Sequence, residues 1–192
     1  MTDPVPSVCV YCGSRSGSRP AYRREAEALG AALAAEGWQL VYGAGDVGLM
    51  GLTARAAQQA GGRTFGVIPV HLLDREVGKR DLSAFVVTET MHERKKVMFM
   101  NASAIVVLPG GAGSLDEFFE VLTWRQLGLH DKPILLMNVD GFWNPLLELI
   151  DHVIAEGFAD ASLRGYLSVV PDAAATVDAL RAALARDRLS AE

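Results

Sequence analysis

The sequence lacks the features by which membrane, secreted and nucleic-acid-binding proteins are recognised. No apolar run approaches the roughly 18 uninterrupted residues that a membrane helix needs, so we expect no contact with a membrane. Residues 1–6 do not combine a basic region with a long apolar run, which favours a cytoplasmic protein over a secreted one. The formal net charge is −5 with both signs interspersed, whereas non-specific nucleic-acid binding requires a basic face. We therefore expect no nucleic-acid partner.

Cysteine is also scarce, and its two positions do not favour redox chemistry. Cys9 and Cys12 form a Cys-x-x-Cys, but they lie in the apolar run Val8–Cys12, which predicts a strand instead of the helix start of a redox motif. Side chains three residues apart on a strand face opposite sides, so we expect two packing cysteines. The four histidines are too scattered to form a metal site, at His71, His92, His130 and His152. We expect no bound metal.

The sequence does contain an alternation of short apolar runs and longer helical stretches, over a length that fits one domain spanning residues 1–192. The apolar runs are mostly continuous, as in parallel strands buried on both faces: Ser7–Gly13, Trp38–Tyr42, Thr64–Ile68, Ala84–Thr88, Ala104–Leu108 and Ile134–Met137. The helical stretches are Tyr22–Glu36, Gly48–Ala60, Met91–Ser103, Leu115–Leu129, Pro145–Glu156 and Ala173–Arg186. This order predicts an α/β fold with a doubly wound parallel sheet flanked by helices. Such folds bind ligands beyond the carboxyl ends of their strands, which makes the loops there the candidate sites.

Two of these loops follow the first and second predicted strands. The loop Gly13–Ser18 is small and polar, and its amides and the Ser14 hydroxyl suit either an oxyanion or a simple strand-to-helix connection. The next loop has the spacing Gly-x-Gly-x-x-Gly at Gly43, Gly45 and Gly48. A dinucleotide site expects this motif after the first strand and an acidic residue at the end of the following strand, where this chain has Gly66–Pro69. A dinucleotide-dependent oxidoreductase is therefore disfavoured, although the glycines still let backbone approach a ligand closely.

The strongest site signal is the loop Pro109–Ser114, with the sequence Pro-Gly-Gly-Ala-Gly-Ser, between a predicted buried strand and a predicted helix. A helix start in this position presents unpaired N–H groups and the positive end of the helix dipole to an anion. The loop lacks the Gly-Lys-Ser/Thr of a Walker loop, but its amides and the Ser114 hydroxyl can still bind a phosphate. We therefore expect an anion site here.

Two charged residues of the neighbouring helices each allow two interpretations. Ser114-x-x-Glu117 matches a capping box, in which the glutamate only satisfies the helix start, and a chemical role for Glu117 is an equally good interpretation. Arg94 shares a helix face with Met91, where a cation needs a partner such as Glu117 or a ligand phosphate. The alternative is a solvated basic face made of Arg94, Lys95 and Lys96.

Three motifs occur along the chain in a fixed order. They are Gly-x-Gly-x-x-Gly-Leu-Met-Gly from Gly43, Met-His-x-Arg-Lys from Met91 and Pro-Gly-Gly-x-Gly-Ser-x-x-Glu from Pro109. In this order they resemble the LOG (Lonely Guy) family of cytokinin riboside 5′-monophosphate phosphoribohydrolases, and the resemblance runs from about Val8 to Phe158. It implies a Rossmann-like homodimer without a cofactor, which hydrolyses the N-glycosidic bond of N6-modified adenosine 5′-monophosphates or AMP. The products would be the free base, a cytokinin, and ribose 5-phosphate.

The resemblance also assigns roles to individual residues. Its catalytic pair falls on Arg94 and Glu117. Its substrate-binding positions, together with Ser14 of the first loop, are Glu76, Arg94, Lys95, Gly111, Ala112, Gly113, Ser114, Leu115, Asp116, Glu117 and Thr123. Two residues depart from the family's usual ones: Ser114 replaces a threonine and keeps the hydroxyl, and Ala44 replaces a glycine and adds one methyl group. Neither departure removes a reactive group.

These roles give a mechanistic hypothesis and leave a rival. Cleavage builds positive charge on the ribose, which Glu117 would stabilise while Arg94 orients it and the amides of Gly111–Ser114 hold the phosphate. The main rival is a non-catalytic carrier of a nucleotide or a molybdenum cofactor, which need not keep the Arg94 and Glu117 pair. The label of lysine decarboxylase carried by some relatives has no support, because no lysine has the context of a pyridoxal-phosphate site.

Overall fold

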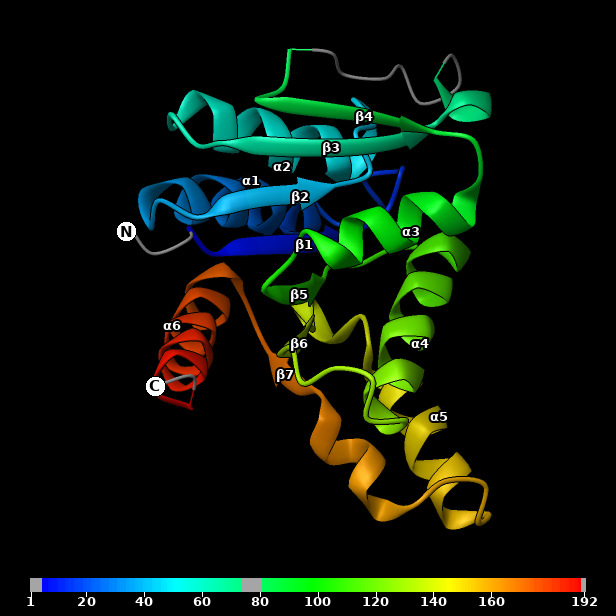
Figure 1. The fold of residues 1–192 in the computed structure, drawn as a ribbon. Helices are drawn as coiled ribbons and strands as arrows, with labels where there is room; N and C mark the ends of the chain where they lie inside the picture. Colours follow the sequence, from blue (N-terminus) through cyan, green and yellow to red (C-terminus); the bar gives the residue numbers. More distant parts are fainter. Residues whose placement is uncertain (1–4, 74–80, 191–192) are drawn as a thin grey trace.

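Seven parallel strands form one sheet in the part of the chain that the computed structural model describes, residues 5–73 and 81–190. Their order across the sheet is β4-β3-β2-β1-β5-β6-β7 (Figure 1). The strands are β1 (Ser7–Tyr11), β2 (Gln39–Tyr42), β3 (Thr64–Pro69), β4 (Ala84–Thr88), β5 (Ala104–Val107), β6 (Ile134–Met137) and β7 (Ser168–Val170). The helices are α1 (Pro20–Ala35), α2 (Gly48–Gln59), α3 (Met91–Met100), α4 (Ala112–Gln126), α5 (Asn144–Ala155) and α6 (Ala173–Ser190), with short 3₁₀ turns η1 (Val70–Leu72), η2 (Val139–Gly141) and η3 (Ala161–Tyr166). The predicted doubly wound α/β fold is confirmed.

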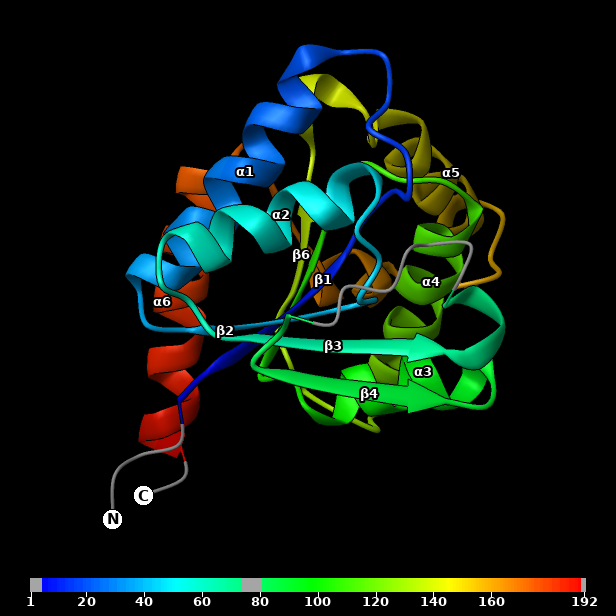
Figure 2. The ribbon, with the colours of Figure 1, turned by 90° about the horizontal axis from the view of Figure 1, so that it is seen from above.

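Helices cover both faces of the sheet, as Figure 2 shows from above. The apolar side chains of α1, α2 and α6, such as Leu29 and Leu180, pack with one face of the strands, which includes Leu40. Those of α3, α4 and α5, such as Phe118, pack with the opposite face, which includes Ile105. Burial on both faces explains why the strands are continuous apolar runs in the sequence.

The two cysteines face opposite sides of the sheet, Cys9 within β1 and Cys12 directly after its last residue. Cys9 packs in the core beneath α4, whereas Cys12 packs in the core beneath α1 and α2. Both are buried and form no disulfide, so the prediction of two packing cysteines is confirmed. Burial is the largest cause that raises the pKa of the Cys9 thiol, which keeps it protonated.

Two expectations from the sequence need correction. The strand β7 was not predicted, because Ser168–Val170 is only three residues long and lies at the sheet edge with an exposed, polar first residue. Helix α4 was expected from Leu115 to Leu129, but it begins at Ala112 and ends at Gln126. Its early start brings three more residues of the glycine-rich loop into the helix, and this matters for the site.

The order of the strands places the candidate loops together. From β1 the chain builds β2, β3 and β4 outward on one side, and it then crosses back to place β5 on the other side of β1. The loops after β1 and β5 therefore flank the switch point at which open α/β sheets bind ligands. A hydrogen bond joins them, in which the Gly13 N–H donates to the Pro109 carbonyl at 3.0 Å, and the Leu49 N–H at the start of α2 donates to the Gly13 carbonyl at 3.0 Å.

The helices of the described part of the chain are all too short or too polar to span a bilayer.

The close approach of α1 and α2 depends on a glycine. A Cβ added at Gly30 in α1 would lie 2.2 Å from the carbonyl oxygen of Thr53 and 3.2 Å from the Cβ of Ala56, both in α2. Backbone atoms cannot move aside as the end of a flexible side chain can. Gly30 therefore sets how closely the two helices pack over β1 and β2.

We predict that Gly30→Ala lowers the free energy of unfolding by about 1–3 kcal/mol, the usual cost of overpacking. This loss should appear although alanine favours a helix over glycine by about 1 kcal/mol. Urea denaturation measures it, and Gly165→Ala is the matched control because no atom lies within 4 Å of its added Cβ. A Gly30→Ala protein as stable as the wild type would contradict this account of the helix contact.

Candidate active site

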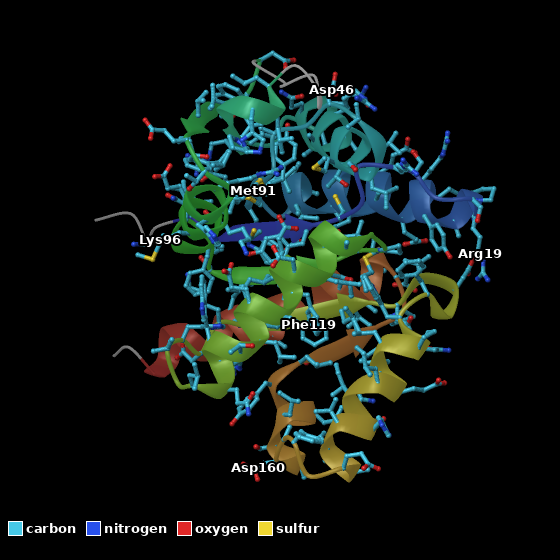
Figure 3. The ribbon with its side chains drawn as sticks, turned by 90° about the vertical axis from the view of Figure 1, so that its right-hand side faces the viewer. Arg19, Asp46, Met91, Lys96, Phe119 and Asp160 are labelled. Atoms are coloured by element: carbon cyan, nitrogen blue, oxygen red, sulfur yellow. The ribbon has the colours of Figure 1, made fainter. Side chains whose placement is uncertain are left out.

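A cavity of about 230 Å³ opens at the carboxyl edge of the sheet, where β1, β2 and β5 end. Figure 3 looks onto this edge and shows Met91 of α3, one of the lining residues, near the middle of the view. The lining brings together residues from the loop after β1, the starts of α2, α3 and α4, and η1: Cys12, Gly13, Ser14, Met50, Leu72, Met91, Arg94, Gly111, Ala112, Gly113, Ser114, Asp116 and Glu117. Most of the site residues predicted from the sequence therefore share one cavity.

The start of α4 forms one side of the cavity. Gly111 is the residue before the helix, and Gly111, Ala112 and Gly113 are all exposed to solvent. The first N–H groups of a helix have no partner within it, so they present donors and a positive dipole end at this point. Ser114 is 3% exposed beneath them, and a Cβ added at Gly110 would lie 2.1 Å from its Oγ. A glycine is therefore required for the loop to fold over Ser114.

The capping-box interpretation of Ser114 and Glu117 is wrong. Ser114 is the third residue of α4 instead of the residue before it, and Gly111 caps the helix without a side-chain hydrogen bond. A capping box occurs at the start of α3, where the Glu93 N–H donates to Thr90 Oγ1 at 3.1 Å and Glu93 Oε2 accepts from the Thr90 N–H at 3.3 Å. Glu117 lies further along α4, where its side chain lines the cavity and does not serve the helix start.

Glu117 acts on the sheet beneath α4 through its charge. After burial, its carboxylate is the next largest cause that raises the pKa of the Cys9 thiol, and it also raises the pKa of the buried Tyr11 hydroxyl. Both groups belong to the core beneath α4, so Glu117 lies between the cavity and the end of β1. A carboxylate at the edge of an apolar core interacts strongly with a cation that develops in the cavity, because little water screens it.

Arg94 is 5% exposed and is held by backbone carbonyls within β3 and directly after β2. Its Nε donates to the Val67 carbonyl at 3.2 Å, and its Nη2 donates to the Gly43 carbonyl at 2.8 Å. These two bonds fix the orientation of the guanidinium. The alternative of a solvated basic face is wrong for Arg94 and for Lys95, which is also 5% exposed, whereas Lys96 is exposed.

The remaining predicted residues lie outside the cavity lining. Lys95 points to α4, where its Nζ contacts Asp116 Oδ2 at 2.9 Å and Glu120 Oε1 at 3.1 Å. Leu115 packs into the core beneath α4, and Thr123 is exposed two turns along the same helix. Glu76 lies outside the described residues.

Sequence reasoning gave no role to Met50 and Met91, which supply much of the apolar wall. Both belong to the motifs quoted above, Gly-Leu-Met-Gly and Met-His-x-Arg-Lys. The sequence therefore predicted that they lie near the candidate loops, but it did not predict that their side chains line the cavity. Ala44, which departs from the usual glycine, has a positive φ of 55° and is fully buried. It does not belong to the lining, so its methyl group leaves the shape of this cavity unchanged.

A second cavity of about 340 Å³ adjoins the first at Gly13, Ser14 and Gly111. Its walls include Tyr22, Leu49 and Phe142, and the Phe142 ring stands edge-on to Tyr22 with ring centroids 5.5 Å apart. Trp143 is 3% exposed and packs in the core, whereas Phe142 also lines this cavity.

Among residues 5–73 and 81–190, no group of three His, Cys, Asp or Glu side chains lies close enough together to hold a metal ion.

Sequence comparison finds relatives over most of the chain. A family profile described as "Possible lysine decarboxylase" matches residues 50–180. The chain is 45% identical over 166 residues to the cytokinin riboside 5′-monophosphate phosphoribohydrolase LOG of Oryza sativa subsp. japonica. The aligned residues make up 86% of this chain and 69% of that protein. It is 43% identical over 175 residues to the cytokinin riboside 5′-monophosphate phosphoribohydrolase LOG5 of Arabidopsis thaliana. Here the aligned residues make up 91% of this chain and 77% of that protein.

Comparison of structures finds the same fold in more distant proteins. The molybdenum cofactor carrier protein of Chlamydomonas reinhardtii superimposes with a TM-score of 0.73 at 22% identity, over 95% of this chain and 99% of that one. The molybdenum cofactor binding protein of Rippkaea orientalis does so with a TM-score of 0.72 at 20% identity, over 94% and 98%. At these identities the likeness establishes the fold and not the ligand.

The position of Arg94 can be tested without changing its chemistry. A Cβ at Gly43 would lie 2.0 Å from Arg94 Nη2 and 2.9 Å from its Cζ, so Gly43→Ala displaces the guanidinium from its place in the cavity. We predict that this variant binds a nucleoside 5′-monophosphate about tenfold or more weakly, the loss expected when one charged hydrogen bond is misplaced. Titration calorimetry measures the affinity, with Gly165→Ala as the control. An unchanged affinity would show that the place of Arg94 does not matter for binding.

Proposed function

Since this chain belongs to the LOG family of cytokinin riboside 5′-monophosphate phosphoribohydrolases, we propose that it hydrolyses the N-glycosidic bond of N6-modified adenosine 5′-monophosphates. The products are a free cytokinin base and ribose 5-phosphate. The observation that carries this function is a single cavity with three components: a glycine-rich helix start for the phosphate, a buried arginine and a carboxylate.

In the proposed complex the phosphate lies at the start of α4. The N–H groups of Gly111 to Ser114 and the helix dipole bind it at a distance from the bond that breaks. Binding energy gained there helps to position the sugar, which explains a preference for nucleotides over nucleosides. The adjoining apolar cavity beside Tyr22 and Phe142 offers space for the base.

Arg94 and Glu117 are the proposed catalytic residues. The bond between ribose C1′ and the base nitrogen breaks, the oxygen of a water molecule bonds to C1′, and one proton of that water passes to the departing base. Positive charge builds on the ribose during this step, and the Glu117 carboxylate stabilises it. A carboxylate beside a phosphate would normally repel it. The buried Arg94 guanidinium, fixed by strand carbonyls, offsets that repulsion and orients the carboxylate.

Two other functions have less support. A carrier of a nucleotide or a molybdenum cofactor would use the same fold, but the proteins of that kind share only 20–22% identity with this chain, whereas the phosphoribohydrolases share 43–45%. The decarboxylase in the family description would need a reactive lysine in the cavity. Lys95 directly follows Arg94, which lines the cavity, but its ammonium contacts two carboxylates of α4 instead.

We also propose that the enzyme is a cytoplasmic homodimer. Support for the dimer comes from apolar side chains exposed on α4 and just after it: Phe119, labelled in Figure 3, is 39% exposed, Leu127 is 66% and Leu129 is 68%. Exposed apolar residues that lie together favour an interface between proteins. Support for the cytoplasm comes from Cys9 and Cys12, which form no disulfide and so fit a reducing compartment.

The function predicts that the purified protein releases free base and ribose 5-phosphate from N6-isopentenyladenosine 5′-monophosphate, and much less from the matching nucleoside. Glu117→Gln should lower kcat by about 10²–10³-fold, the usual effect of removing one group that stabilises a transition state by its charge. Chromatography of the base measures both results.

Because Glu117 does not cap α4, its substitution should leave the melting temperature close to that of the wild type. Glu148→Gln, an exposed carboxylate on α5, is the matched control. Turnover of Glu117→Gln near that of the wild type would exclude the assigned role. Absence of turnover in the wild type with every nucleoside monophosphate would exclude the function.

A further inference from the structure

The buried lysine beside Arg94 has an unusual set of contacts. Lys95 has a side chain that is 6% exposed, and its ammonium lies between two carboxylates of α4, 2.9 Å from Asp116 Oδ2 and 3.1 Å from Glu120 Oε1. Burial lowers the pKa of Lys95, but the hydrogen bonds and charges of Asp116 and Glu120 outweigh it and raise the pKa above its ordinary value. The contacts with Asp116 and Glu120 therefore favour the charged form of Lys95.

The residues of this ion pair are the sequence neighbours of the two proposed catalytic residues. Lys95 directly follows Arg94 in α3, and Asp116 directly precedes Glu117 in α4. Contact between Lys95 and Asp116 therefore joins the backbone of one proposed catalytic residue to the backbone of the other. Figure 1 shows α3 and α4 as neighbouring helices that run in different directions.

Arg94 and Lys95 fix α3 in two directions. Arg94 ties it to β2 and β3 through the carbonyls of Gly43 and Val67, while Lys95 ties it to α4. The rings of Phe99 and Trp124, 4.9 Å apart, join the two helices near their other ends, so loss of Lys95 would release α3 from α4 beside the cavity. The distance across the cavity, from guanidinium to carboxylate, would then vary.

Lys95 also compensates a concentration of negative charge. Asp116, Glu117 and Glu120 lie within two turns of α4, and like charges at this spacing destabilise one another. Lys95 contacts the two that flank Glu117 and leaves Glu117 to the cavity.

We propose that Lys95 is a positioning residue, which sets the separation and the charge environment of the catalytic residues Arg94 and Glu117 through its ion pairs with Asp116 and Glu120. This inference rests on the proposed function. It differs from the role implied by family resemblance, in which Lys95 itself contacts the nucleotide. A positioning lysine acts on the rate of the reaction, whereas a lysine on the phosphate acts on binding.

The test compares Lys95→Met with Lys96→Met, which removes the neighbouring exposed ammonium. We expect Lys95→Met to lower kcat at saturating nucleotide by about 10²-fold, the usual cost of misplacing reacting groups by about 1 Å. Its Kd for ribose 5-phosphate should stay within about threefold of the wild type, because the start of α4 is unchanged. Lys96→Met should match the wild type in both measurements.

The pH profile supplies a readout that a structural role would not move. In the described part of the chain, the titratable and charged groups near Glu117 include Cys9 and Tyr11 of β1, Arg94 across the cavity, and Asp116 and Glu120 of α4, which Lys95 contacts. Without Lys95, the uncompensated carboxylates disfavour a charged Glu117, so the acid limb of kcat moves to higher pH. Glu120→Gln added to Lys95→Met removes one carboxylate and should move the limb back and restore part of the rate.

Three outcomes would overturn the inference. Ribose 5-phosphate binding that weakens tenfold or more in Lys95→Met, with kcat retained, would place the lysine on the phosphate. A lower kcat with an unmoved acid limb and no recovery in the double variant would reduce Lys95 to a structural role. If Lys95→Met does not fold, Asp116→Asn serves in its place, because this carboxylate is 62% exposed and tolerates substitution. Wild-type kcat in Asp116→Asn would then overturn the inference.

The same experiments separate this inference from the proposed function. A wild-type protein without turnover refutes the function itself. A wild type with turnover and a Lys95→Met variant equal to Lys96→Met refutes only the role of Lys95.

Discussion

All strands of the sheet run in one direction, and this constraint determines where every other part of the molecule lies. Parallel strands end at the same edge, so the loops that follow them gather there although they are far apart in the sequence. The return of the chain from β4 to β5 separates the loops after β1 and β5 and opens a crevice between them. The hydrogen bond from Gly13 to Pro109 spans its base. Arg94, the start of α4 and Ser14 meet because three strand ends meet.

Backbone supplies much of the chemistry of this crevice. The start of α4 offers N–H groups for an anion, and two carbonyls, one within β3 and one directly after β2, hold a guanidinium. Both uses require backbone to approach closely, and the glycines supply this at Gly43 and Gly110, where a Cβ would contact Arg94 or Ser114. Two charged side chains, Arg94 and Glu117, then stand in an environment that is fixed before a ligand arrives. Such preorganisation is the main source of electrostatic catalysis.

Periodicity in the sequence predicted most of the fold, and β4 and β6 have the predicted bounds, because strands buried on both faces leave a continuous apolar run. A three-residue edge strand such as β7 leaves too short a pattern to detect. The motif at Ser114 was ambiguous for a different reason: Ser-x-x-Glu has the same letters whether the serine caps the helix or lies three residues after the capping residue, as it does here. Whether Lys95 is buried was also invisible, because its partners Asp116 and Glu120 come from another helix that local pattern does not place.

The depth of Cys9 gives the molecule an internal reporter. Its thiol is fully buried between β1 and α4, and the helix separates it from solvent. Burial and the charge of Glu117 raise its pKa and keep it protonated. A thiol-modifying reagent can reach it only when α4 lifts from the sheet or the chain unfolds. The rate of Cys9 modification therefore measures how often the wall that carries Glu117 opens, and a ligand that bridges α4 to the rest of the crevice should slow that rate.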